Sequence, residues 1–310
     1  MKRFVTLLCI GLVYTGIVFA QADAGTQTLF IIKTKSLPTT NLLVSAIHAT
    51  TPDTVVIREF DLEGKQELGS SIIRSIKAQI SNPDDVTVLA LGSPATQLAI
   101  DYLDNIRIIY TMADRNKLRS SQNGNIYEVS DKSSISDQIQ ILEKLLPTAK
   151  NIGIIADIQQ SGWLKNEISL ARNSSELGIH LRTIGSSREV PSLLWEFLPQ
   201  IDAIIFVQDP KVINGNSYRY VVTTALENNL PTLVYSSYLV EAGFLGAYLP
   251  TPEETARKIM VLLGVVAAGE QAPVDGTEAK PSMLLILNQN TLQILGVKVP
   301  ESLRNIIQIK

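Results

Sequence analysis

Short β-branched runs alternate with amphipathic, helix-length stretches from about residue 28 onward, and this alternation constrains the fold more than any other feature. Some runs, such as Val86–Gly92, are apolar nearly throughout, which suits strands covered on both faces. The predicted strands are Thr28–Lys33, Thr54–Phe60, Val86–Gly92, Arg107–Asp114, Ile126–Val129, Asn151–Asp157, His180–Gly185, Ala203–Asp209, Thr232–Ser237 and Met283–Asn288. The pattern therefore predicts an α/β fold with parallel sheets flanked by helices.

Helix signals fill the intervals between the predicted strands. Thr251, Pro252 and Glu254 stand in the order of a capping box, with a proline at the first helical position. Further helices are predicted over about 134–146, which stops at Pro147, and around an apolar stripe that includes Leu164. Strands and helices thus follow one another regularly.

The alternation pauses in a polar stretch, 120–134, and restarts at Asn151. We interpret the two blocks as two doubly wound parallel-sheet lobes, 23–148 and 149–250. We expect the helix at 251–270 to join the first lobe and residues 280–310 to join the second. The chain is then expected to pass between the lobes more than once.

The N-terminus has the three zones of a secretory signal peptide: Lys2 and Arg3, an apolar run over residues 4–20, and then small residues. We expect a signal peptide of residues 1–22 with cleavage after Ala22, although a cut after Ala20 or Ala24 also fits. The alternative is a membrane anchor, since the run is at the short end of the spanning range. The expected product is an exported, periplasmic protein.

Composition excludes several classes of protein. The single cysteine, Cys9, excludes an internal disulfide framework. Lys and Arg number 27 against 30 Asp and Glu, without a basic cluster, so no nucleic-acid partner is expected. There is no phosphate loop, no GxGxxG turn, no HExxH and no GxSxG, and the two histidines, His48 and His180, stand far apart in sequence. We expect no metal, no cofactor and no catalytic activity, with an exported α/β enzyme kept as a minor alternative.

Small polar residues recur at the carboxyl ends of the predicted strands, where open α/β sheets bind ligands. Ser93 begins a helix whose N-terminus can hold a carboxylate, or it simply caps that helix. An aspartate at a strand end can receive a ligand ammonium, or it caps the next helix. Trp163 stacks on an aromatic ligand or packs on its own helix, and the segment 34–36 is a minor candidate. The candidate ligand-binding residues are Ser93, Thr96, Asp114, Ser161, Asp209 and Ser236.

Several stretches in order resemble one known family, the substrate-binding proteins of ABC transporters for aromatic and other amino acids. They are VLALGSPATQLAI (88–100), LLPTAKNIGIIAD (145–157), SSELGIHLRTIGSSREV (174–190), QIDAIIFVQDPKV (200–212), NNLPTLVYSS (228–237) and ILNQNTLQILGVKVPESL (286–303). The resemblance runs from about residue 86 to the end. It implies a type I periplasmic-binding-protein-like fold of two lobes that close on a ligand.

The resemblance also assigns roles to positions. Ser93 and Thr96 fall in the first-lobe ligand loop, Asp209 matches the acidic residue of a second-lobe strand, and Ser236 lies in the loop after another. Ser161 falls near an Asn-Ser element, which reads Gln-Ser here. Further departures are Arg115 where the family commonly has proline after Asp114, Gly124–Glu128 in place of Gly-Asn-x-Thr-Gly, and Pro252–Ala256 in place of Tyr-x-x-x-Gly.

From these patterns and this resemblance we expect a monomeric, exported solute-binding protein. It would capture an amino acid or similar carboxylate between its lobes and deliver it to the membrane permease of an ABC transporter. The alternative is a periplasmic sensory or interaction module that partners a membrane signalling protein, which the departures from the family pattern motivate.

Overall fold

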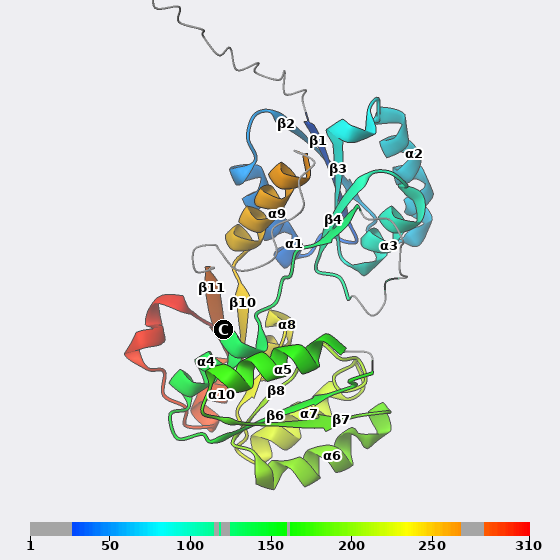
Figure 1. Cartoon of the computed structure of the whole chain (residues 1–310). Coiled ribbons are helices and arrows are strands. Elements are labelled where there is room, and N and C mark those ends of the chain that lie inside the picture. The colour runs from blue at the N-terminus through cyan, green and yellow to red at the C-terminus, as the bar shows by residue number, and fades with distance from the viewer. Residues whose placement is uncertain (1–26, 115–117, 119–124, 160–161, 268–281) are drawn as a thin grey trace, which may run out of the picture.

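A computed structural model describes residues 27–114, 118, 125–159, 162–267 and 282–310. Its elements form two lobes, each built around one sheet (Figure 1). The α/β fold with two parallel-dominated sheets, predicted from the alternation, is confirmed. Expected features within residues 1–26, including the signal peptide, lie outside the described residues, as does Ser161.

The first lobe contains a parallel sheet in the order β2-β1-β3-β4-β5. Apolar side chains of α2 and α3 cover one face, and those of α1 and α9 cover the other. The elements are β1 (Gln27–Lys33), α1 (Pro38–Thr50), β2 (Val55–Asp61), α2 (Gly69–Gln79), β3 (Val86–Leu91), α3 (Ser93–Tyr102), β4 (Arg107–Thr111), β5 (Ile126–Glu128) and α9 (Pro252–Ala267). Burial of all six residues of β3 matches its uninterrupted apolar sequence.

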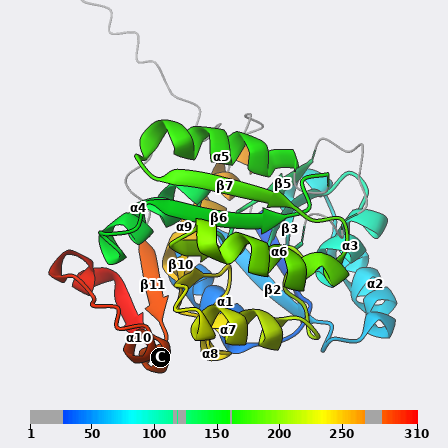
Figure 2. The ribbon, with the colours of Figure 1, turned by 90° about the horizontal axis from the view of Figure 1, so that it is seen from below.

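The second lobe contains a sheet in the order β12-β11-β10-β9-β8-β6-β7, parallel except where β10 meets β11. Its elements are α4 (Ile135–Leu145), β6 (Asn151–Ala156), α5 (Gly162–Ser174), β7 (Gly178–Thr183), α6 (Val190–Phe197), β8 (Ala203–Ile205), α7 (Tyr218–Glu227), β9 (Thr232–Leu233), α8 (Ser237–Glu241), β10 (Gly246–Pro250), β11 (Met283–Leu287), α10 (Gln289–Ile294) and β12 (Ile307–Ile309). Figure 2 shows α5 on one side of β6 and β7 and α6 on the other.

Helix α4 packs in the second lobe, because its side chains Ile135, Ile139 and Leu142 share a core with Ile152 of β6. The boundary between the lobes therefore lies before α4, and not between residues 148 and 149 as the sequence suggested. The chain passes between the lobes after β5, after β10 and after α9. At one passage, the Ser133 hydroxyl donates to the carbonyl of Tyr248 over 2.7 Å.

Each sheet has a switch point, where neighbouring strands lead to connections that run in opposite directions. In the first lobe it lies between β1 and β3, and in the second between β6 and β8. In open α/β sheets, ligands bind at the carboxyl ends of the strands beside such points. The strand order alone therefore selects residues just after β1, β3, β6 and β8.

No helix in the described part of the chain is both long and apolar enough to cross a membrane.

Candidate ligand-binding site

The first-lobe switch point is built around the tight turn from β3 into α3. Gly92 has a φ of +91°, and a Cβ there would lie 2.8 Å from Oγ1 of Thr34, so the turn requires glycine. The Thr34 hydroxyl oxygen in turn accepts the backbone N–H of Ala95 over 3.1 Å. The ends of β1 and β3 are thereby locked together at the start of α3.

Ser93 is half-buried at the first position of α3, and its Oγ accepts the backbone N–H of Asp114 over 2.8 Å. The serine hydrogen therefore remains for a ligand oxygen. Few other donors are left at this helix start, because Pro94 has no N–H and the N–H groups of Ala95 and Thr96 bond to Thr34 and Gly92. Of the several N–H groups expected to bind a carboxylate at this helix start, the N–H of Ser93 remains, together with its hydroxyl.

Thr96 is fully buried, and its hydroxyl donates to the carbonyl of Gly92 over 2.9 Å. This bond stabilises the first turn of α3. Sequence alone could not distinguish such a structural role of Thr96 from a ligand contact. Asp114 is nearly buried, two residues beyond Met112, which adopts a φ of 56°. Asp114 thus sits beside Ser93, at the ends of β4 and β3 respectively.

The second-lobe switch point carries two buried aspartates. Asp157 follows β6 and is 4% exposed, and Asp209, in the loop after β8, is 2% exposed. Oδ2 of Asp209 accepts the backbone N–H of Asp157 over 2.6 Å, and Oδ1 accepts the backbone N–H of Lys211 over 2.8 Å. The carboxylate of Asp209 therefore fastens the loop after β8 to the end of β6, and these bonds do not cap the next helix, α7, which begins at Tyr218.

Lys211 brings a positive charge to these carboxylates. Its Nζ donates to Oδ2 of Asp157, whose Oδ1 accepts the backbone N–H of Gln159 over 3.0 Å. Sequence reasoning assigned no role to Asp157 or Lys211. The only available signals were the aspartate that ends the strand sequence NIGIIAD and the lysine two residues after Asp209.

Tyr235 connects the two switch points. It follows β9, and its phenol lies within electrostatic reach of Asp114 in the first lobe and Asp209 in the second. Burial, together with the negative charges of Asp114 and Asp209, raises the pKa of Tyr235 to about 12. The carboxyl ends of both sheets therefore come close together here, with the phenol of Tyr235 within electrostatic reach of one aspartate from each lobe.

Ser236, the next residue, caps α8 through its Oγ, which accepts the backbone N–H of Leu239 over 3.4 Å. Trp163 lies in the first turn of α5 and is 41% exposed, so it is not part of the α5 core stripe. The structure thus brings Ser93, Asp114 and Asp209 to one region, together with Tyr235, which the sequence did not single out.

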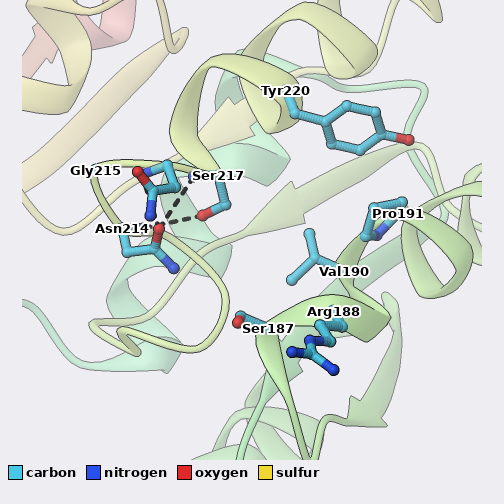
Figure 3. A pocket seen from close by; sticks show the side chains of 9 residues that line it. Ser187, Arg188, Val190, Pro191, Asn214, Gly215, Ser217 and Tyr220 are labelled. Atoms are coloured by element: carbon cyan, nitrogen blue, oxygen red, sulfur yellow. Dashed lines mark hydrogen bonds between the residues drawn. The ribbon is translucent and has the colours of Figure 1, made fainter.

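A depression of about 460 Å³ lies on the second lobe, and its lining does not include Ser93, Asp114, Asp209 or Tyr235. Figure 3 shows the loop carrying Asn214 and Ser217 facing the segment with Ser187 and Arg188. Asn214 is occupied in shaping its own loop, because its Oδ1 accepts two backbone N–H groups and its Nδ2 donates to the carbonyl of Pro210. The depression and the switch point therefore share one connection, the loop from β8 to α7.

Several known proteins resemble this chain in sequence or in structure. The tyrosine-binding protein of Clostridioides difficile (strain R20291) is 23% identical over 233 residues, which cover 73% of this chain and 67% of that protein. An ABC domain from Streptococcus pneumoniae, solved in complex with L-Trp, superimposes with a TM-score of 0.58 at 19% identity, covering 92% of this chain and 99% of that one. A substrate-binding protein with adhesive properties from Clostridium difficile, solved in its ligand-free, open form, gives a TM-score of 0.66 at 20% identity and the same coverage.

These structures establish the fold as that of the type I periplasmic binding proteins. The model of one family, described as ABC transporter substrate binding protein, matches residues 55–307. Proteins of this family bind small ligands and work with ABC permeases. The chain belongs to the ABC transporter substrate-binding protein family.

Proposed function

We propose that the protein captures a small carboxylate-bearing ligand, an amino acid or a close analogue, between its lobes and delivers it to an ABC permease. The observation that carries this proposal is the position of Tyr235, whose phenol lies near Asp114 of one lobe and Asp209 of the other. Two switch points that face each other form the place where a ligand can contact both sheets at once.

The proposed binding places the ligand carboxylate at the start of α3. There, the hydroxyl and backbone N–H of Ser93 donate to it, and the positive end of the α3 dipole adds a favourable field. Contacts from the second lobe then favour the closed arrangement over the open one by the difference in ligand affinity between the two. Passages of the chain between the lobes, such as the one at Ser133 and Tyr248, are the natural hinge.

The names of the relatives narrow the ligand class. One is a tyrosine-binding protein and another was solved with L-Trp, so aromatic amino acids and their analogues are the first ligands to test. We further propose that the chain acts as a monomer in the periplasm after removal of residues 1–22. The proposed role involves binding and release, without a catalytic step.

Calorimetry tests the proposal on protein purified without refolding and shown to be folded and ligand-free. The panel comprises the common amino acids and the carboxylic acids that lack their amino group. We expect one or a few members to bind with one-to-one stoichiometry, and small-angle scattering to show a smaller radius of gyration with the bound ligand. An absence of heat from the whole panel would contradict the capture of a small carboxylate.

A further inference from the structure

Lys211 places its ammonium group on Asp157, whose backbone is hydrogen-bonded to Asp209. The sequence suggested that the strand-end carboxylate Asp209 receives such a group. In the structure, the cation beside the paired strand ends of β6 and β8 is the chain's own, because Nζ of Lys211 donates to Oδ2 of Asp157. A side chain of the protein itself therefore supplies the positive charge that pairs with Asp157 in the second lobe.

Hydrogen bonds around Asp157 and Asp209 hold Lys211 in place. Both oxygens of Asp209 accept backbone N–H groups, one of them from Lys211 itself. Both oxygens of Asp157 also accept hydrogen bonds, one from the backbone of Gln159 and one from Lys211. The main chain and the side chain of Lys211 thus attach to the two different carboxylates.

The burial of Asp157 disfavours the binding of a ligand ammonium at this place. The Asp157 side chain is 6% exposed, so its charge depends on a nearby cation, and removal of one partner from a buried ion pair is costly. A ligand ammonium could reach this place only by displacing Lys211, which exchanges one positive charge for another and brings no electrostatic gain. The Lys211 side chain remains 31% exposed, so an ammonium with three N–H donors can bond to Asp157 and still donate to a ligand oxygen.

We propose that Lys211 determines ligand specificity, selecting carboxylic acids that lack an α-amino group over the corresponding amino acids. This inference rests on the proposed function, since it concerns the ligand captured between the lobes. In it, Lys211 substitutes for the ligand ammonium beside Asp157 and Asp209 and presents its remaining N–H groups to acceptor atoms of the ligand.

Matched ligand pairs provide the test. Each pair is an amino acid and its des-amino acid, beginning with L-tryptophan and indole-3-propionate and with L-tyrosine and 3-(4-hydroxyphenyl)propionate. The dissociation constants within a pair are compared for the wild type, Lys211→Met and Lys211→Arg. Met keeps much of the length of the side chain without its charge, and Arg keeps the charge.

We expect the wild type to bind the des-amino member at least about tenfold more tightly. The Lys211→Met variant, with Asp157 left without that cation, should shift this ratio by at least about tenfold toward the amino acid. The Lys211→Arg variant should retain the wild-type preference. Because the readout is a ratio within one variant, a general loss of affinity does not imitate the effect, and thermal unfolding confirms that each variant is folded.

Two results would overturn the inference in different ways. If the wild type prefers amino acids and Lys211→Met leaves that preference unchanged, Lys211 does not determine specificity, although the proposed capture of a carboxylate stands. If no amino acid and no des-amino acid binds to any of the folded variants, the proposed function fails together with the inference.

Discussion

The backbone N–H of Asp157 donates to Oδ2 of Asp209 over 2.6 Å, and this bond joins the ends of β6 and β8 at the second-lobe switch point. The other oxygen of Asp209 holds the backbone of Lys211, so a single buried carboxylate sets the position of the loop that carries the lysine. Charge-assisted bonds from a carboxylate to backbone N–H groups are stronger than neutral ones. The shape of the candidate site thus depends on an aspartate that works chiefly within the protein.

Asp209→Asn should lower the free energy of unfolding by about 2 kcal/mol, because the amide nitrogen would face a backbone N–H donor and leave a buried group unsatisfied. The measurement is urea denaturation followed by circular dichroism. Asp53→Asn, at an exposed position, is the matched control and should change stability by less than about 0.5 kcal/mol. Equal stability of the Asp209→Asn variant and the wild type would show that these bonds contribute little.

Tyr235 should keep its phenolic proton to unusually high pH. Burial, together with the charges of Asp114 and Asp209, raises its pKa from 10.0 to about 12. In a spectrophotometric titration of folded protein, Tyr235→Phe should remove the tyrosinate step near pH 12. Tyr238→Phe, which alters an exposed tyrosine of α8, should leave that step in place.

The same shift predicts the direction of a pH effect on stability. The unfolded chain releases the Tyr235 proton near pH 10, while the folded protein holds it to about pH 12. The stabilisation is therefore complete below pH 10 and is lost as the pH rises from 10 to 12. Urea titrations across this window should show a shallower fall for Tyr235→Phe than for the wild type, and parallel curves would contradict the burial of the phenol near two carboxylates.

Periodicity predicted most of the fold because the central strands of both lobes, such as β3 and β6, are buried on two faces and read as apolar runs. The strand β10 escaped prediction, since it begins with Gly246 and ends with Pro250, residues that ordinarily signal loops. The structure explains the glycine: a Cβ at Gly246 would lie 2.9 Å from the carbonyl oxygen of Ile286 in the neighbouring strand. The short strand β12 also escaped, because only three residues pair with β11.

The candidate site was harder to predict from the sequence than the fold. Strand ends could be located, which brought Ser93, Asp114 and Asp209 into view, but whether a side chain faces a ligand or caps a helix depends on contacts between distant segments. Lys211 and Asp157 are 54 positions apart, and no local pattern pairs them. The strand order, which sets the switch points, is likewise a property of the assembled sheets.

Ser93 and Thr96 should respond differently to substitution, although they stand three positions apart. Ser93→Ala should weaken ligand binding about tenfold, since it removes the hydroxyl that we propose donates to the ligand and also loosens the Asp114 backbone. Thr96→Val should leave the dissociation constant unchanged and lower the free energy of unfolding by about 1 kcal/mol, because its buried hydroxyl donates to the carbonyl of Gly92 within the protein. Calorimetry and urea denaturation on both variants separate the two roles, and a loss of affinity in Thr96→Val would return Thr96 to the ligand site.

Gly92→Ala should disturb both stability and binding. A Cβ at a φ of +91° is strained, and it would also press against Oγ1 of Thr34 at 2.8 Å, so we expect a loss of about 2 kcal/mol in the free energy of unfolding. The matched control is Gly215→Ala, where an added Cβ meets no atom within 4 Å and the φ is not positive. Because Thr34 holds the N–H of Ala95, its displacement should also shift the start of α3 and weaken binding at Ser93. Wild-type stability and affinity in Gly92→Ala would show that the first-lobe turn tolerates a different shape from the one in this structure.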